Sequence, residues 1–326
     1  MWLYDPGQFA VGVIMTSLIK YGEWVALWLE SKKGVVKEST YANYSMAAIN
    51  HIIPSLGNYT ISDISESVVQ ETVIQWVNYG RMAGGGLSKK TVKDMLSIIK
   101  LSLKAAAKKK IISAVPEMDV IVPLSVSVNK VITFSHDEQN KILSIALESP
   151  TPRNVGVVIS LLAGLRIGEL CALKWSDINM ENRTIHVTKT MQRLYLKEIS
   201  GTKESRVTVT PPKTRSSNRI VPISSRLFLY LSTIVSEDPE AYVITGKKEY
   251  LEPRTYRSYY NRLLSRHGIE HVKFHGLRHT FATRCIEAGA DCKTVSVLMG
   301  HATVNMTLNM YVHPGMDQKR KCVELI

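Results

Sequence analysis

Four short patches of the sequence combine arginine, histidine, lysine and tyrosine at spacings that suit chemistry on a phosphate. In the first, Arg166 and Glu169 stand three residues apart within an otherwise apolar stretch, where an unpaired guanidinium would be very costly to bury. Glu169 lies one helical turn further on and can orient Arg166, although a purely structural buried ion pair is the simpler explanation of this patch alone. The second patch, residues 212–219, has the sequence PKTRSSNR and predicts a basic turn between two strands.

The other two patches place histidines near a further arginine and a tyrosine. His275 and Arg278 are three residues apart, so on a helix they face the same way. Gly300 fits the C-cap of a helix, which would place His301 at the mouth of a loop. Tyr311 follows ten residues after His301.

Together these side chains have the chemistry needed to break a phosphodiester. Two guanidiniums can clamp the nonbridging oxygens of one phosphate and stabilise the charge that develops there, a task otherwise given to a metal. Glu169 is the only acid near these motifs, so we expect no metal site and no other cofactor. A tyrosine with a pKa of about 10 needs a base and a positive field before it attacks. A histidine and the arginines would supply these, and Lys213, on a flexible turn, can protonate the leaving oxygen.

The first part of the chain predicts a small all-α domain. Its expected helices are Leu18–Lys33, Ser39–Ile53, Ser65–Tyr79 and Ser88–Ile112, with Pro54 ending the second of them. The last helix ends in a basic cluster, Lys108, Lys109 and Lys110. These lysines either contact phosphates or are simply exposed to solvent at the helix end.

The second part predicts a mixed domain, joined to the first by a linker over residues 113–133 that contains two prolines. Ser135 and Glu138 have the spacing of a helix capping box, and Val155–Leu165 predicts a helix buried nearly all round. Three β-rich runs, Thr184–Thr190, Val207–Thr210 and Ile220–Ile223, predict a small antiparallel sheet. A helix over Pro253–His267 suits a phosphate backbone, with a solvated face as the alternative; it carries Arg254, Arg257 and Arg262.

Composition narrows the class of partner. The 326 residues include 41 Lys+Arg and 28 Asp+Glu, a net charge of +13, of which +3 lies in residues 1–129 and +10 in residues 130–326. This excess favours a polyanion, above all nucleic acid. A hydrophobic content of 45% excludes a disordered basic tail. The four cysteines form no C-x-x-C pair, and no apolar stretch is long enough for a membrane span, so we expect a reduced, cytoplasmic protein.

These motifs resemble those of the tyrosine recombinase, or phage integrase, family. The similarity lies in "LLAGLRIGELCALKWSDI", "TPPKTRSSNRIVPI", "FHGLRHTFAT" and "LMGHATVNMTLNMYVHP", which match the family's catalytic blocks in order, and in "YANYSMAAINHIIPSLGNYTISDI", which is similar to its core-binding domain. The resemblance implies Tyr311 as nucleophile and Arg166 and Arg278 as phosphate clamp. It further implies Lys213 as general acid, His275 as general base, His301 as a phosphate contact and Glu169 as a supporting acid.

The resemblance also implies an architecture. We expect a helical core-binding domain over 18–112, the linker 113–133 and a mixed, mainly helical catalytic domain with a small antiparallel sheet over 134–313, closing on DNA as a C-shaped clamp. Residues 1–17 match no family element, and the tail 314–326 either docks on a neighbouring protomer or frays. The ten-residue spacing before Tyr311 and an extended hairpin near Leu194–Val207 are similar to the branch from conjugative transposons and Gram-positive prophages. The arm-binding domain common in that branch is not evident here.

The expected activity is site-specific strand exchange through a 3′-phosphotyrosyl intermediate, without metal or ATP. The expected partners are double-stranded DNA with att-type sites, three further protomers in a homotetramer on DNA, and an accessory DNA-bending or excision factor, all in the cytoplasm at the nucleoid. Arg215 and Arg219 in the basic turn join the other basic residues as expected DNA contacts. The alternatives are a noncatalytic architectural protein of the same fold, or a topoisomerase-like or telomere-resolving tyrosine enzyme.

Overall fold

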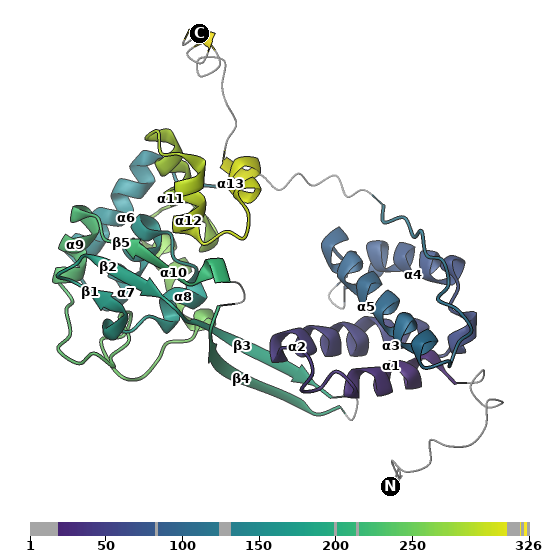
Figure 1. Cartoon of the computed structure of the whole chain (residues 1–326). Helices are drawn as coiled ribbons and strands as arrows, with labels where there is room; N and C mark the ends of the chain where they lie inside the picture. The colour runs from purple at the N-terminus through teal and green to yellow at the C-terminus, as the bar shows by residue number, and fades with distance from the viewer. Residues whose placement is uncertain are drawn as a thin grey trace. The chain divides into compact units, whose positions relative to one another are not determined.

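The chain forms two compact units, each built around its own hydrophobic core (Figure 1). The computed structural model describes residues 19–81, 84–123, 132–198, 201–212 and 215–311, with positions 320, 323 and 324. The first unit takes in Met1–Val128 and Leu194–Arg206, and the second Asn129–Arg193 and Val207–Ile326. The expected leader, Lys213 and nearly all of the expected tail lie outside the described residues.

The first unit is helical, as predicted. Its helices are α1 (Tyr21–Glu30), α2 (Glu38–Ala47), α3 (Ile53–Leu56), α4 (Glu66–Tyr79) and α5 (Lys89–Lys108). Ser65 and Ser88 cap α4 and α5, since the hydroxyl of each accepts a hydrogen bond from a backbone N–H of the first helical turn. The helices enclose large apolar side chains, among them Trp24, Trp28, Ile52, Val73 and Ile99.

Pro54 does not end the second helix, contrary to the sequence-based expectation. A π-helical turn, η2 (Ala48–Ile52), continues α2 directly into α3, and Pro54 lies in the first turn of α3. A proline inside a continuous helix removes one backbone hydrogen bond, and the change to π-helical bonding in the turn before Pro54 is how this helix accommodates it.

Part of the expected linker packs on the first unit. The side chain of Gln70 on α4 brackets Ile121: its Nε2 donates to the Ile121 carbonyl at 3.0 Å, and its Oε1 accepts from the Ile121 N–H at 2.8 Å. Glu66 accepts from the N–H of Asp119 in the same way. On the other side of the undescribed segment 124–131, Phe134 is buried in the core of the second unit.

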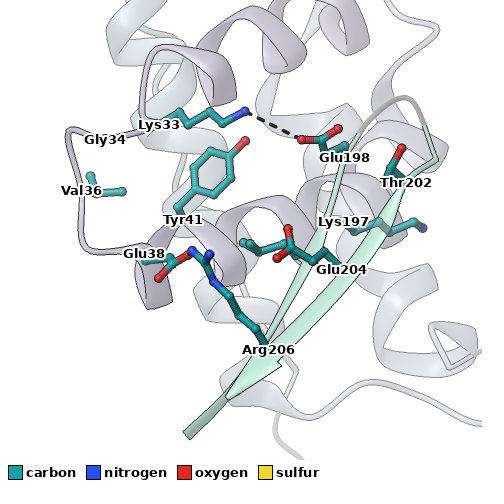
Figure 2. Close-up of a pocket in the computed structure, with 11 residues that line it drawn as sticks. Lys33, Gly34, Val36, Glu38, Tyr41, Lys197, Glu198, Thr202, Glu204 and Arg206 are labelled. Atoms are coloured by element: carbon teal, nitrogen blue, oxygen red, sulfur yellow. Dashed lines mark hydrogen bonds and ion pairs between the residues drawn. The ribbon is translucent and has the colours of Figure 1, made fainter. Parts of the chain in front are cut away.

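The first unit also contains the tip of a hairpin formed by β3 (Thr190–Lys197) and β4 (Lys203–Thr210). The Ser45 hydroxyl donates to the Lys197 carbonyl, and Lys197 Nζ donates to Asn50 Oδ1 at 2.7 Å. Ion pairs join Lys33 to Glu198 and Glu38 to Arg206. Between these contacts lies a pocket of about 490 Å³, into which Tyr41 points beneath Lys33 (Figure 2).

The second unit packs helices around one small antiparallel sheet and also contains the base of the β3–β4 hairpin. Its helices are α6 (His136–Glu148), α7 (Pro152–Ala163), α8 (Ile167–Ala172), α9 (Ser225–Ser232), α10 (Pro253–Arg266), α11 (His275–Glu287), α12 (Cys292–Met299) and α13 (Val304–Tyr311). The predicted capping box at Ser135 and Glu138 opens α6. The prediction of a buried helix is confirmed as well, because nine of the twelve residues of α7 are buried.

Three of the strands coincide with predicted β-rich runs, but two others were not predicted as runs and the strands form two sheets instead of one. The order β1 (Ile178–Asn179), β2 (Thr184–Val187), β5 (Arg219–Pro222) makes one antiparallel sheet, whereas β3 and β4 form a separate pair. Ile185 faces Val221 across the β2–β5 ladder, and both are buried in the core. The expected strand over residues 184–190 is therefore divided between the two sheets.

We expect Gly164→Ala to destabilise the second unit. Gly164 ends α7 with a φ of +67°, and a Cβ there would stand 2.6 Å from Phe281 Cδ1. Gly289→Ala is the matched control, because its φ is +87° and nothing lies within 4 Å of its added Cβ. The left-handed conformation costs either variant about 1–2 kcal/mol, and overpacking adds about 1–3 kcal/mol at position 164 alone. Thermal unfolding should show the larger fall in Tm for Gly164→Ala; equal falls would contradict the close approach.

Candidate active site

Glu169 joins two of the arginines singled out in the sequence. Its carboxylate accepts from the Arg166 N–H at 3.0 Å and from Arg166 Nη1 at 2.7 Å. Arg219 donates to both carboxylate oxygens, at 3.1 and 3.0 Å. Burial by itself raises the pKa of Glu169, but the hydrogen bonds and charge of Arg219, together with Arg166, hold that pKa below its ordinary value. Glu169 is thus a buried, ionised carboxylate between two guanidiniums.

The C-terminal end of α12 holds three arginines through consecutive backbone carbonyls. The carbonyl of Leu298 accepts from Arg219 Nε at 2.7 Å, that of Met299 from Arg278, and that of Gly300 from Arg166 Nη2 at 3.1 Å. The last carbonyls of a helix lack partners within the helix and carry its negative dipole end. Gly300 adopts a φ of +60° as C-cap, as the sequence predicted. The helix end therefore gathers positive charge.

Arg278 is almost completely buried, with a relative exposure of 1%. Its Nη1 donates to the carbonyl of Gly164 at 2.6 Å, at the end of α7. Burial lowers the pKa of the guanidinium, and the neighbouring Arg166 lowers it further. Arg278 thus places a desolvated positive charge directly behind the site.

Two predicted histidines lie beside these charges. His301 follows the Gly300 cap, and its Nδ1 is 2.8 Å from Thr307 Oγ1. Burial and then the charge of Arg278 lower the pKa of His301 to about 4. His275, at the start of α11, also has a lowered pKa through desolvation and then the charges of Arg278 and Arg166. Both imidazoles are therefore neutral at neutral pH and available as acceptors.

Tyr311 ends α13, and its ring packs in a small apolar cluster with Ala282, Val295 and Met299. Its hydroxyl lies 2.5 Å from Nδ1 of His279, a residue of α11. Burial raises the pKa of Tyr311 to about 12, although the charges of Arg278 and Arg166 act in the opposite direction. The phenol is therefore protonated at rest.

A pocket of about 320 Å³ opens beside Arg166 and His301. The side chain of Arg166 is 34% exposed, although Glu169 and the Gly300 carbonyl hold its two terminal nitrogens, so this arginine is both fixed in place and partly accessible. A phosphate has the size and charge to enter this pocket. The remaining lining residues include Thr190, Gln192, Pro212, Ser217 and Met306.

The expected DNA contacts divide into three groups. Arg254, Arg257 and Arg262 are exposed on α10, and the cluster Lys108–Lys110 is exposed at the end of α5. The expectation for Arg219 is wrong: its side chain is 3% exposed and donates to Glu169, because the buried carboxylate needs a second partner. Lys213 and the side chain of Arg215 lie outside what the structure describes.

Sequence reasoning missed His279. Its spacing of four residues from His275 places both imidazoles on one face of α11, and their ring centroids are 4.5 Å apart in an edge-to-face arrangement. That spacing was the available signal. The contact of His279 with Tyr311, 32 positions further along the chain, could not be predicted from that spacing.

Within the described part of the chain, no group of three or more His, Cys, Asp or Glu side chains is arranged to hold a metal ion. No helix in those same residues is long and apolar enough to cross a membrane.

Family models match both units. The model of the phage integrase family matches residues 133–318, and that of the phage integrase N-terminal SAM-like domain matches residues 20–77. The first covers more than half of the chain. The chain therefore belongs to the phage integrase family and is a tyrosine recombinase.

Named relatives and solved structures agree with this assignment. The chain is 27% identical to a XerC-like tyrosine recombinase of Caldanaerobacter subterraneus over 94% of its own length and 83% of the relative's. It is 25% identical to the transposase from transposon Tn916 of Enterococcus faecalis, over 80% and 66% of the two chains. The Tn1549 transposon integrase in complex with a circular intermediate DNA has the same fold, with a TM-score of 0.73 at 23% identity, covering 94% of this chain and all of that one.

We expect Glu169→Gln to destabilise the second unit in a pH-dependent way. The pKa of Glu169 is lower in the folded protein than in the unfolded chain, so its ionised form contributes stability above the unfolded value of about 4.3. This contribution is lost as the pH falls through the lower, folded value. At pH 7, breaking the buried pair should cost about 3–5 kcal/mol.

Urea unfolding of both proteins from pH 7 down to pH 3 checks this expectation. The difference in unfolding free energy between wild type and Glu169→Gln should become smaller as the pH falls. Glu181→Gln, at an exposed carboxylate, is the matched control and should stay within about 0.5 kcal/mol of wild type. A difference that is the same at every pH would contradict the ionised state assigned to Glu169.

Proposed function

We propose that this recombinase cuts one DNA strand by attack of Tyr311 on a phosphodiester and passes that strand to a partner duplex. The Tyr311 Oη–P bond forms as the P–O5′ bond breaks, which leaves a 3′-phosphotyrosyl link and a free 5′ hydroxyl. The 5′ hydroxyl of the partner strand then attacks the link and releases the tyrosine. One phosphoester replaces another at each step, so ATP has no energetic role.

The observation that carries this proposal is the cluster of guanidiniums next to Tyr311. Arg166 lines the pocket and is partly exposed, while Arg278 is a buried positive charge near it. A phosphorane gains negative charge as it forms, and fixed positive groups in a water-poor site stabilise it more than they stabilise the substrate. Their fields also favour the phenolate over the phenol.

The remaining groups divide the proton transfers and phosphate contacts. His301 would donate a hydrogen bond from Nε2 to a phosphate oxygen, since Thr307 engages its Nδ1. Lys213 would protonate the leaving 5′ oxygen, and the family resemblance assigns the general base to His275. Pro212, the residue before Lys213, lines the pocket.

DNA would be held by both units. We assign Arg254, Arg257 and Arg262 on α10, Arg215 in the basic turn and the cluster Lys108–Lys110 to phosphate contacts. The solved relatives in complex with DNA include the Tn1549 transposon integrase and a lambda integrase tetramer bound to a Holliday junction. By analogy, four protomers of this chain would exchange strands between two att-type sites in the cytoplasm at the nucleoid, with an accessory bending or excision factor.

Tyr311→Phe should abolish covalent attachment while leaving DNA binding intact. The substitution removes the attacking oxygen and keeps the ring that packs against Met299. The measurement is an SDS-stable protein–DNA adduct on nicked att-site DNA, with binding followed by gel shift. Arg166→Ala should form adduct about 10²–10³-fold more slowly. An adduct formed equally by Tyr311→Phe would remove Tyr311 as nucleophile and with it the proposed function.

Removing three of the four arginines of α10 should make DNA affinity less dependent on salt. Each phosphate contact contributes about 0.9 to the slope of log K against log salt, so Arg254→Ala/Arg257→Ala/Arg262→Ala should reduce the slope by about 3. The control variant, Lys141→Ala/Arg226→Ala/Lys248→Ala, removes three exposed charges from other elements of the same unit. An unchanged slope in the α10 variant would contradict its role as a DNA-binding surface.

A further inference from the structure

The hydroxyl of Tyr311 has a polar partner that the family resemblance does not assign. Helices α11, α12 and α13 pack together (Figure 1), and the tyrosine ring is enclosed by Ala282, Val295 and Met299. With a relative exposure of 9%, Tyr311 is nearly buried in this apolar cluster. Its hydroxyl meets Nδ1 of His279 at 2.5 Å. An O–H group at this distance from a ring nitrogen makes a short, strong hydrogen bond.

The chemistry of the two groups sets the direction of that bond. Burial, with the charges of His275 and Arg278 on the same helix, lowers the pKa of His279 to about 4, so its imidazole is neutral at neutral pH. The phenol has a raised pKa and retains its proton. Tyr311 therefore donates and His279 Nδ1 accepts, which places the proton of His279 on Nε2.

His275 occupies a different position. It is exposed, and its ring meets that of His279 edge-to-face, at an interplanar angle of 88°. No hydrogen bond links His275 to Tyr311 among the described residues, and the pKa of Tyr311 responds to Arg278 and Arg166. His279 thus lies between His275 and the nucleophile.

We propose that His279, rather than His275, accepts the phenolic proton when Tyr311 attacks the phosphate. This rests on the proposed function, in which Tyr311 is the nucleophile. As the Oη–P bond forms, the proton passes from Oη to His279 Nδ1 and the P–O5′ bond breaks, with a separate acid protonating O5′. When the 5′ hydroxyl of the partner strand attacks, its proton passes to the now deprotonated acid, and His279 returns its own proton to the departing Tyr311 oxygen. Both groups are thereby regenerated in each cycle.

The resting site protects the nucleophile. A pKa of about 12 for the phenol and about 4 for the imidazole keep the proton on Tyr311 until attack begins. Once the Oη–P bond starts to form, the phenolic oxygen loses electron density and its proton becomes acidic. Proton transfer then accompanies the attack instead of preceding it, and the enzyme carries no free phenolate in the absence of DNA.

The proposal is tested by single-turnover cleavage of nicked DNA that carries a bridging sulfur at the 5′ position of the scissile phosphate. This leaving group needs no general acid, so the rate reports on activation of Tyr311. We expect His279→Ala to slow cleavage about 10²–10⁴-fold, and added imidazole to restore much of the rate. His279→Asn offers an amide that can accept a hydrogen bond but cannot take the proton, so it should stay slow. His186→Ala, at an exposed histidine of β2, should cleave as wild type does.

Other results would overturn the proposal. Wild-type rates in His279→Ala would do so, as would wild-type rates in His279→Asn, which would reduce His279 to a positioning hydrogen bond. If added imidazole restored the cleavage rate of His275→Ala but not that of His279→Ala, His275 would be the acceptor of the phenolic proton. Thermal unfolding and gel shifts of every variant separate these outcomes from misfolding, and His279→Asn retains nearly the shape of the native side chain. Failure of the proposed function has a different signature, since wild type would then form no Tyr311-dependent adduct.

Discussion

Three guanidiniums cannot be held close together inside a protein unless negative charge offsets their repulsion and their lost hydration. Here Arg166, Arg219 and Arg278 converge on two such sources. One is the buried carboxylate of Glu169, which both Arg166 and Arg219 contact. The other is the C-terminal end of α12, where three consecutive carbonyls each accept from a different arginine. The second source leaves the cluster with a net positive charge, because carbonyl groups orient guanidiniums without neutralising them. A site that binds a phosphate needs this net positive charge.

This charge sets the protonation states around it. Burial and the arginines together lower the pKa values of His275, His279 and His301, so all three imidazoles can accept or donate as neutral groups. The same arginines act on Tyr311 in the direction that favours its phenolate, but burial outweighs them and the phenol stays protonated. Desolvation thus keeps the proton on Tyr311 despite the nearby arginines. A positively charged pocket and a protonated tyrosine are two consequences of one electrostatic arrangement.

The backbone that supports this arrangement depends on two helix ends. Gly164 and Gly300 both adopt left-handed conformations, which end α7 and α12 and turn their last carbonyls toward the arginines. Residues with a Cβ adopt that conformation at a cost, and Phe281 and Arg219 crowd the two positions further. Away from the site, the hairpin tip is fastened to the helical unit by Ser45 and Asn50, so one segment of the catalytic sequence belongs structurally to the other unit.

The sequence by itself determined whatever depends on neighbours along the chain. Capping residues set the start of α6, apolar composition buried α7, the Gly300 cap placed His301, and motif order indicated the family. Local patterns also placed Arg166 beside Glu169. Only the tertiary structure decided that Arg219 turns inward to Glu169, 50 positions away, and that the Tyr311 hydroxyl meets His279 and not His275. The local sequence around Arg219 is compatible both with an arginine exposed on a basic turn and with an arginine buried in an ion pair. Which of them forms depends on a carboxylate brought there by folding, and propensity and periodicity contain no information about that.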